Sequence, residues 1–258
     1  MRSRRQQKVI AQPHKAILRG QRKIKAKPGQ RETVRKVLKA GGQRICVIRS
    51  VGGIGDVLMA TPALREMKAR FPECHLTFAI DRHRTFDDAY YSLVKNAPFI
   101  DAVRDARYVV RSSYDKVVDI SAVCLPYERT GLPSLNRIDL FSKALGFGSL
   151  QNTLPFYQVD VIESLWARQL IGIGYGPVIG VHTASHDEKR SLPFEKHREL
   201  ITLLNSRIPN VRILLFDFNY RDKGLEQMKG VIPCSSYKLR EVAALIAQCD
   251  VFFGPDSG

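Results

Sequence analysis

Short apolar runs alternate with segments of helical period in the middle of the chain. The apolar runs have the length and β-branched content of buried strands, and they fall within residues 44–50, 71–81 and 114–121. The segments that place apolar residues at helical spacing are 61–70, 85–96 and 136–147. Because strands and helices alternate with short links, this pattern predicts a parallel, doubly wound α/β sheet.

The alternation restarts after a break. Residues 148–160 are irregular, 161–172 have a helical period, and the Gly- and Pro-containing segment 173–177 is a candidate hinge. Further strands are predicted within 177–185, 211–217, 230–236 and 250–258. Further helices are predicted within 192–208, 221–230 and 239–249.

The whole pattern predicts two tandem Rossmann-like domains of α/β class, 44–160 and 176–258, joined by a helical connector at 161–175. The second domain supplies about four strands, and a Pro-Asp-Ser-Gly turn follows where another helix is expected. Open sheets of this kind usually have five or six strands. We therefore expect the second domain to be truncated.

The glycines of "RSVGGIGDVLMATPALREM", residues 49–67, form a predicted strand–turn–helix with Asp56 at or near the helix start. The spacing is neither the dinucleotide fingerprint nor a P-loop. Asp56 has two interpretations, a helix cap and a general base at the rim of a cleft between the domains. Pro62 fits only near a helix start, so we expect the first turn close to 57–61, or a bend there.

A second candidate site follows the strand at 177–185. The hydroxyl residues Thr183 and Ser185 leave this strand, and Lys189 and Arg190 precede a helix that opens at Pro193. Hydroxyls and cations at a helix start suit a diphosphate, whereas a solvated charged loop is the alternative. His182 and His186 lack metal-ligand partners at a useful spacing, so we expect structural roles for both and no metal site.

A third candidate site ends the last predicted strand, where the turn Gly254-Pro255-Asp256-Ser257-Gly258 reaches the carboxyl edge at which open sheets bind ligands. An ordinary turn is the alternative.

Composition and charge describe an ordinary globular protein with a basic arm. The chain is 44% hydrophobic and 26% charged, and no apolar run approaches the roughly 20 residues of a membrane span. Residues 1–43 hold 14 Lys and Arg and one acid, a net charge of +13 out of +16. The five cysteines form no CxxC pair, which favours buried free thiols in a reducing cytoplasm.

The arm is predicted to be largely disordered or helical, with a short basic amphipathic helix at 32–40. Such a helix suits an anionic membrane surface, and the phosphates of a nucleic acid would suit it as well. A solvated tail whose last turn packs on the globule is the third alternative. We expect a cytoplasmic protein that is peripheral on the inner face of the membrane.

Three motifs in this order resemble glycosyltransferase family 9, the lipopolysaccharide heptosyltransferases. "GGIGDVLMATPALREMKARFP" is similar to the family's N-terminal signature, "KRSLPFEKHRELI" to its Lys-Arg-Trp-Pro segment, and "VAALIAQCDVFFGPDSG" to the approach to its Asp-(Ser/Thr)-Gly motif. The resemblance covers residues 44–258. It implies a GT-B fold whose first domain holds the acceptor and whose second holds a nucleotide-activated sugar.

The resemblance implies an inverting, metal-independent transferase without a cofactor, in which Asp56 deprotonates the acceptor hydroxyl. Its donor would be a nucleoside diphosphate sugar, heptose-like and possibly ADP-linked, and its acceptor a cell-envelope glycolipid such as lipopolysaccharide core. The donor-binding residues would be Gly53, Gly55, Thr183, Ser185, Lys189, Arg190, Asp217, Tyr237, Asp256, Ser257 and Gly258. The acceptor-binding residues would be Gly52, Arg82 and Arg84.

The chain departs from the family pattern at several positions. Leu192 replaces the family tryptophan, "DFNYRD" replaces a glycine-rich segment near Asp217, and the basic arm is additional. One alternative is a non-catalytic accessory protein with a degenerate transferase fold, whose arm binds nucleic acid or another polyanion. A weaker alternative is a nucleotide-sugar epimerase, which acts without an acceptor.

Overall fold

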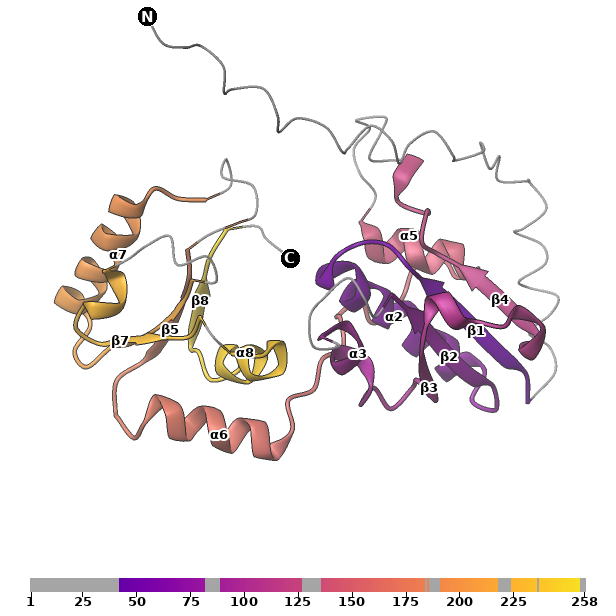
Figure 1. Ribbon diagram of the computed structural model, residues 1–258, viewed down its shortest axis with the longest axis horizontal. Coiled ribbons are helices and arrows are strands. Elements are labelled where there is room, and N and C mark those ends of the chain that lie inside the picture. The colour runs from indigo at the N-terminus through magenta and orange to yellow at the C-terminus, as the bar shows by residue number, and fades with distance from the viewer. Residues whose placement is uncertain are drawn as a thin grey trace, which may run out of the picture. The chain divides into compact units, whose positions relative to one another are not determined.

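The computed structural model describes residues 42–81, 89–126, 136–183, 185, 191–217, 224–235 and 237–255 (Figure 1). These residues form two four-stranded parallel sheets with the strand orders β3-β2-β1-β4 and β7-β6-β5-β8. The predicted α/β class with parallel sheets is therefore confirmed. In both sheets the chain crosses from one side of the first strand to the other, between β3 and β4 and between β7 and β8. Such a switch point is where open α/β sheets bind ligands, at the carboxyl ends of the strands.

The first sheet contains β1 (Arg44–Arg49), β2 (His75–Ile80), β3 (Ala102–Asp105) and β4 (Lys116–Asp119). Its helices are α2 (Ile54–Arg70), α3 (Ala89–Val94) and α5 (Arg137–Ala144), and two 3-10 turns, η4 (Ala106–Tyr108) and η5 (Arg111–Ser113), link β3 to β4. The sequence pattern missed β3. Its four residues "AVRD" are only partly buried, so they form no apolar run.

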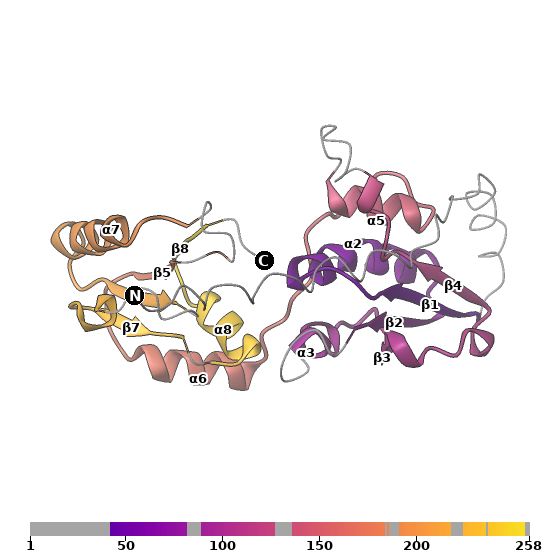
Figure 2. The ribbon, with the colours of Figure 1, turned by 45° about the horizontal axis from the view of Figure 1, so that its top comes forward.

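The two faces of the first sheet are covered differently. Helices α2 and α5 pack together on one face (Figure 2). On the other face, Cys46, Ile48 and Ala79 form a cluster against Ala106, Val109, Tyr114 and Val117, which lie in the link from β3 to β4 and in β4. Because side chains alternate along a strand, Arg49 falls on the same face as Ile45 and Val47, where α2 and α5 lie.

Helix α2 begins earlier than the proline suggested, at Ile54, and Pro62 lies inside it. The predicted helix start at 57–61 is therefore wrong. Proline has no amide to bond the carbonyl four residues back, which is that of Leu58. The Thr61 hydroxyl donates to the Leu58 carbonyl oxygen at 2.6 Å, and the same hydroxyl oxygen accepts from the Phe156 amide at 2.7 Å. A side chain thus replaces the missing backbone hydrogen bond.

The second sheet contains β5 (Val178–His182), β6 (Arg212–Phe216), β7 (Val231–Pro233) and β8 (Val251–Phe253). Its helices are α6 (Val161–Ile171), α7 (Phe194–Arg207) and α8 (Leu239–Ile246), with a 3-10 turn, η7 (Leu225–Gln227). The four predicted strands are confirmed. Within its described part, the predicted helix at 221–230 is only the single turn η7, because Gly224 and Gly230 on either side have positive φ.

Helices cover both faces of the second sheet. One apolar cluster joins α6 and α8 to the sheet through Ala167, Leu214, Phe216, Val242 and Leu245. The other joins α7 to it through Ile179, Val181, Ile201, Ile213 and Leu215. Cys46, Cys74, Cys124 and Cys234 are buried free thiols, as predicted, and Cys249 is half-buried.

The candidate hinge at 173–177 is tied to β6. Arg212 donates to the carbonyl oxygens of Gly172, Gly174 and Gly176 at 2.8, 3.2 and 2.7 Å. Across the described residues no helix is long and apolar enough to span a membrane. Residues 1–41 of the basic arm 1–43, with the predicted helix at 32–40, lie outside the described residues, and the role of the arm stays a prediction.

Candidate functional site

Asp56 lies just beyond the carboxyl end of β1, in the first turn of α2. The chain leaves β1 at Arg49 and enters α2 with Gly53 as the N-cap residue, so Asp56 is the third helical residue. The Gly53 amide donates to Asp56 Oδ2 at 2.9 Å. The anion at this helix N-terminus is therefore the protein's own carboxylate, which resolves why a glycine turn suited to anions carries an aspartate.

Arg49 forms a buried ion pair with this carboxylate. Its Nη2 lies 3.2 Å from Asp56 Oδ1, and the two side chains are 3% and 6% exposed. Arg49 Nη1 donates to the carbonyl oxygens of Ile120 and Ser121 at 3.0 and 2.7 Å. The guanidinium also lies over the ring of Phe141, 4.9 Å from its centroid. Four groups from three different elements or their ends thus fix this cation in place.

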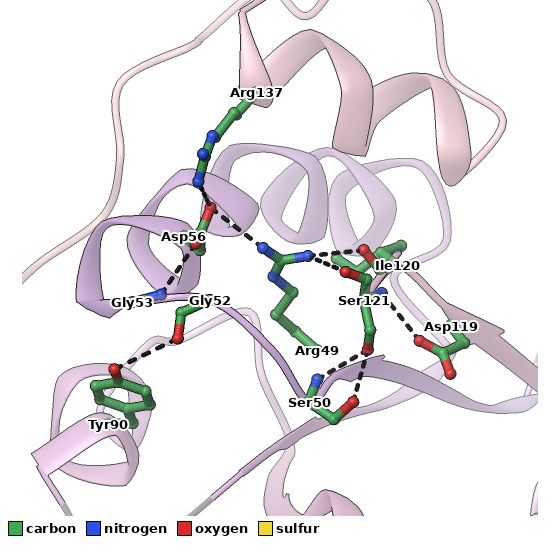
Figure 3. A network of polar contacts seen from close by, with 10 residues as sticks. All are labelled: Arg49, Ser50, Gly52, Gly53, Asp56, Tyr90, Asp119, Ile120, Ser121 and Arg137. Carbon is green, nitrogen blue, oxygen red and sulfur yellow. Dashed lines mark hydrogen bonds and ion pairs between the residues drawn. The ribbon is translucent and has the colours of Figure 1, made fainter. Parts of the chain in front are cut away.

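Arg137, the first residue of α5, reaches Asp56 from the other side (Figure 3). Its Nη1 forms a short ion pair with Asp56 Oδ1, the same oxygen that Arg49 contacts. The Arg137 side chain is 39% exposed, far more than that of Arg49. The carboxylate therefore has one buried cation and one accessible cation.

Gly52 makes room for this arrangement. Its φ is +107°, a conformation that side chains rarely adopt, and an added Cβ would lie 2.1 Å from Asp56 Oδ2 and 2.6 Å from Arg49 Nη2. The Tyr90 hydroxyl donates to the Gly52 carbonyl oxygen at 3.5 Å. Only a glycine fits here, since the backbone passes directly beside the ion pair.

Hydroxyl groups link the ends of β1 and β4 beneath the site. The Ser50 amide donates to Ser121 Oγ at 2.9 Å, and the two serine hydroxyls are also 2.9 Å apart. Asp119 Oδ1 in turn accepts from the Ser121 amide at 2.9 Å. These bonds fix the spacing of the two strands on either side of the switch point, and so fix the carbonyls that hold Arg49.

The corresponding end of the second sheet carries three buried polar residues. Thr183 and Ser185 follow β5 and Asp217 follows β6, and they are 1%, 0% and 4% exposed. Ser191 Oγ accepts from the Ser185 amide at 2.8 Å. Thr183 Oγ1 is buried and has no hydrogen-bond partner in the part of the chain that the structure describes. A buried hydroxyl of this kind is available to a ligand oxygen.

Two further residues follow strands of this sheet, Gly254 after β8 and the predicted donor contact Tyr237 after β7. Gly254 follows β8, and a Cβ there would lie 2.8 Å from His182 Cβ, so glycine permits the ends of β5 and β8 to approach closely. The Tyr237 ring packs edge-on against Trp166 at 5.2 Å between centroids. Burial raises the pKa of the Tyr237 hydroxyl, and the nearby Cys234 and Glu241 raise it further.

Several predicted site residues lie outside the described residues: Arg82, Arg84, Lys189, Arg190, Asp256, Ser257 and Gly258. His186, for which a structural role was predicted, lies outside them as well. The contacts predicted for the site residues stay predictions, as do the donor roles of Gly53, Gly55 and Tyr237. In the described ranges no group of three or more His, Cys, Asp or Glu side chains is placed to hold a metal ion.

The sequence reasoning missed the two arginines that hold Asp56. Arg49 carried a signal, since a charged residue followed the four apolar residues of the strand "RICVIR" and lies on the side that faces helices. Arg137 carried none, because it lies 81 residues from Asp56 and meets it only through the packing of α5 on α2.

No family model matches the chain, and no curated protein matches it. Solved structures do match. A glycosyltransferase family 9 protein from Veillonella parvula aligns with a TM-score of 0.65 and 15% identity, over 83% of this chain and 76% of that one. The chain has the family 9 fold.

Two E. coli structures of the same fold also align. The ADP-heptose lipopolysaccharide heptosyltransferase II gives a TM-score of 0.59 at 15% identity, over 83% of this chain and 79% of that one. The heptosyltransferase WaaC with ADP gives a TM-score of 0.56 at 18% identity, over 83% and 81%. The fold of these structures thus agrees with the motif resemblance of the sequence.

Proposed function

We propose that the protein is an inverting glycosyltransferase that moves a heptose-like sugar from a nucleoside diphosphate donor to a cell-envelope glycolipid such as lipopolysaccharide core. One observation carries the proposal. A buried carboxylate, Asp56, is held by three groups at the switch point of a sheet whose fold is that of family 9.

Asp56 is proposed as the general base. An ionised carboxylate has about four lone-pair sites, and the described contacts use three, two on Oδ1 and one on Oδ2. A hydroxyl of the acceptor would give its proton to the carboxylate as its oxygen bonds to the anomeric carbon. The bond from that carbon to the diphosphate breaks, the diphosphate leaves with the electron pair, and the configuration inverts.

The donor is proposed to bind at the carboxyl ends of β5, β6 and β8. Thr183 and Ser185 would supply hydroxyls to the diphosphate, and Lys189 and Arg190 would meet its charge. The WaaC structure of the same fold is a complex with ADP, which favours an ADP-linked donor here. No resident metal is part of this proposal.

Calorimetry with ADP- and UDP-linked sugars tests the donor site, and mass spectrometry of a lipopolysaccharide-core acceptor tests transfer. We expect binding of one donor class by the wild type and equal binding by Asp56→Asn. Arg104→Gln, an exposed arginine on β3, is the control for a simple change of charge. If the wild-type protein binds none of the donors, the proposal is refuted.

The accessory-protein alternative has one observation in its favour, the net charge of +13 in residues 1–43. It predicts salt-dependent binding of RNA or DNA that is lost when residues 1–40 are deleted. A membrane-directed arm predicts instead that the same deletion removes binding to anionic vesicles and leaves donor binding intact.

A further inference from the structure

The second sheet has a cavity at the edge where its strands begin. The residues that line it include Val178 at the start of β5, Arg212 at the start of β6 and Asp250 directly before β8. Residues of the last turn of α6 and of the segment 172–177 line it as well. Its volume is about 560 Å³, which suits a small organic molecule. Since Thr183 follows β5 at its carboxyl end, this cavity lies at the opposite edge of the parallel sheet from the proposed donor site.

Arg212 brings a half-buried positive charge to this cavity. Its two Nη atoms donate to carbonyl oxygens of the segment 172–176 at 2.8, 3.2 and 2.7 Å. Its Nε is buried and has no hydrogen-bond partner in the described ranges. Carbonyl oxygens carry only partial charges, so they fix the direction of the guanidinium without neutralising it. Among the described residues no carboxylate forms an ion pair with Arg212.

Two other arginines of low exposure show what Arg212 lacks. Arg49, with a side chain that is 3% exposed, pairs with Asp56 at 3.2 Å. Arg240, with a side chain that is 12% exposed, pairs with Glu163 Oε2 at 2.6 Å. Removing a cation from water without an anionic partner is unfavourable. The surroundings of Arg212 therefore favour an anion from outside the protein.

Arg168, in the last turn of α6, adds a second guanidinium to the lining. Its Nε donates to Gln248 Oε1 at 3.1 Å, and it forms no ion pair in the part of the chain that the structure describes. Asp250 is the only acid among the described lining residues, and its Oδ2 accepts from the Val178 amide at 2.8 Å. The lining thus carries two positive charges and one negative charge.

We propose that this cavity binds a small sugar phosphate, as a second ligand site of the protein. The two guanidiniums match the nearly two negative charges of a phosphate monoester, and both would donate to its oxygens. Asp250 Oδ1, which has no hydrogen bond within the described residues, would accept from a hydroxyl of the sugar. The ligand would then supply the counter-ion that Arg212 lacks.

Binding of glucose 6-phosphate to the full chain tests the proposal without an activity assay. NMR signals of the Gly172 and Gly176 amides report the cavity, and the Thr183 amide reports the opposite edge of the sheet. We expect glucose 6-phosphate to shift the two glycine signals, inorganic phosphate to bind more weakly, and glucose to leave them unchanged. Affinity should fall about tenfold in Arg168→Gln, because hydrogen bonds from a charged donor are lost.

Matched variants separate this site from a general effect of charge. Arg198→Gln, which removes an exposed arginine of α7, should leave binding unchanged, and Arg168→Lys should bind better than Arg168→Gln. Asp250→Asn should bind inorganic phosphate about two- to fivefold more tightly, because it removes the one described acid of the lining. It should also reduce the preference for glucose 6-phosphate over phosphate.

Three results would overturn the proposal. One is the absence of any shift at Gly172 and Gly176, including the case in which only the Thr183 signal moves. Another is an affinity for glucose 6-phosphate that is the same in Arg168→Gln as in the wild type. The third is an equal loss of affinity in Arg168→Gln and Arg198→Gln. None of these results bears on sugar transfer, which is measured separately.

Discussion

β1 and β5 occupy the same position in two sheets of equivalent strand order, and polar residues follow both. After β1 the polar groups satisfy one another: Asp56 is bound by Arg49, Arg137 and the Gly53 amide. After β5, Thr183 Oγ1 is buried without a hydrogen-bond partner among the described residues. The β1 end is therefore stabilised by ion pairs within the protein, whereas the β5 end has a buried hydroxyl available to a ligand.

This difference corresponds to two proposed functions, proton transfer at the β1 end and phosphate binding at the β5 end. A group that takes a proton must be held in a fixed orientation, and a network of internal bonds achieves this at a cost in lost freedom. A group that binds a phosphate oxygen gains most when the ligand supplies its missing partner. Substitutions at the β1 end should therefore affect stability and catalysis together, and those at the β5 end should affect binding alone.

Arg49→Met should have the largest effect on stability. It leaves the Asp56 carboxylate without its buried partner and removes the donor to the Ile120 and Ser121 carbonyl oxygens. Breaking one side of a buried ion pair costs about 3–5 kcal/mol. Urea unfolding measures this loss, and Arg104→Met, at an exposed position, should change stability by less than about 0.5 kcal/mol.

Gly52→Ala should be the next most damaging. The new Cβ would collide with Asp56 Oδ2 at a φ of +107°, so both strain and displacement of the carboxylate follow. We expect the free energy of unfolding, measured by thermal unfolding, to fall by about 2–3 kcal/mol. The rate of sugar transfer should also fall strongly. Gly55→Ala is the matched control, since its nearest neighbour would be Met59 Cε at 3.8 Å and alanine favours the helix by roughly 0.5–1 kcal/mol. Equal destabilisation by both would contradict the steric account.

Asp101→Asn should have a moderate effect that depends on pH. Burial opposes ionisation of Asp101, but its bonds to Lys68 Nζ and to the Leu76 amide outweigh burial and lower its pKa below 3.8. A lowered pKa contributes stability above the unfolded-state value, and this stability is lost as the pH falls through the folded-state value. We expect a cost of about 1 kcal/mol at pH 7 that shrinks below pH 4, measured by urea unfolding across this range. A stability difference between the wild type and Asp101→Asn that does not change with pH would contradict this role of the Asp101 carboxylate.

Thr183→Val should change stability least, by less than about 1 kcal/mol and in either direction, because the hydroxyl that it removes has no described partner. Donor affinity should fall about five- to tenfold in the same protein. Calorimetry with the donor and thermal unfolding together separate the two effects. A large loss of stability with unchanged affinity would remove Thr183 from the donor site.

The sequence predicted the two sheets because strand-length apolar runs and helical segments report local burial directly. It misplaced the start of α2, since the repair of Pro62 by the Thr61 hydroxyl is a side-chain bond that no spacing rule reports. It missed β3 because a half-exposed edge strand needs no apolar run.

The candidate site was predicted in part. Asp56 was identified because a carboxylate in a glycine turn is locally unusual. Its cationic partners were not, because Arg137 meets it only after α5 packs on α2. The carbonyl oxygens of Ile120 and Ser121 hold Arg49 beside it only after β4 pairs with β1. Local pattern identified the reacting group, whereas tertiary packing determined how it is held.

The base role of Asp56 is tested most directly by single-turnover transfer with Asp56→Asn at saturating donor. The amide still accepts the Gly53 hydrogen bond through its oxygen but cannot take a proton. We predict a rate at least about a hundredfold lower than that of the wild type, with donor affinity unchanged. A rate equal to that of the wild type would contradict the account.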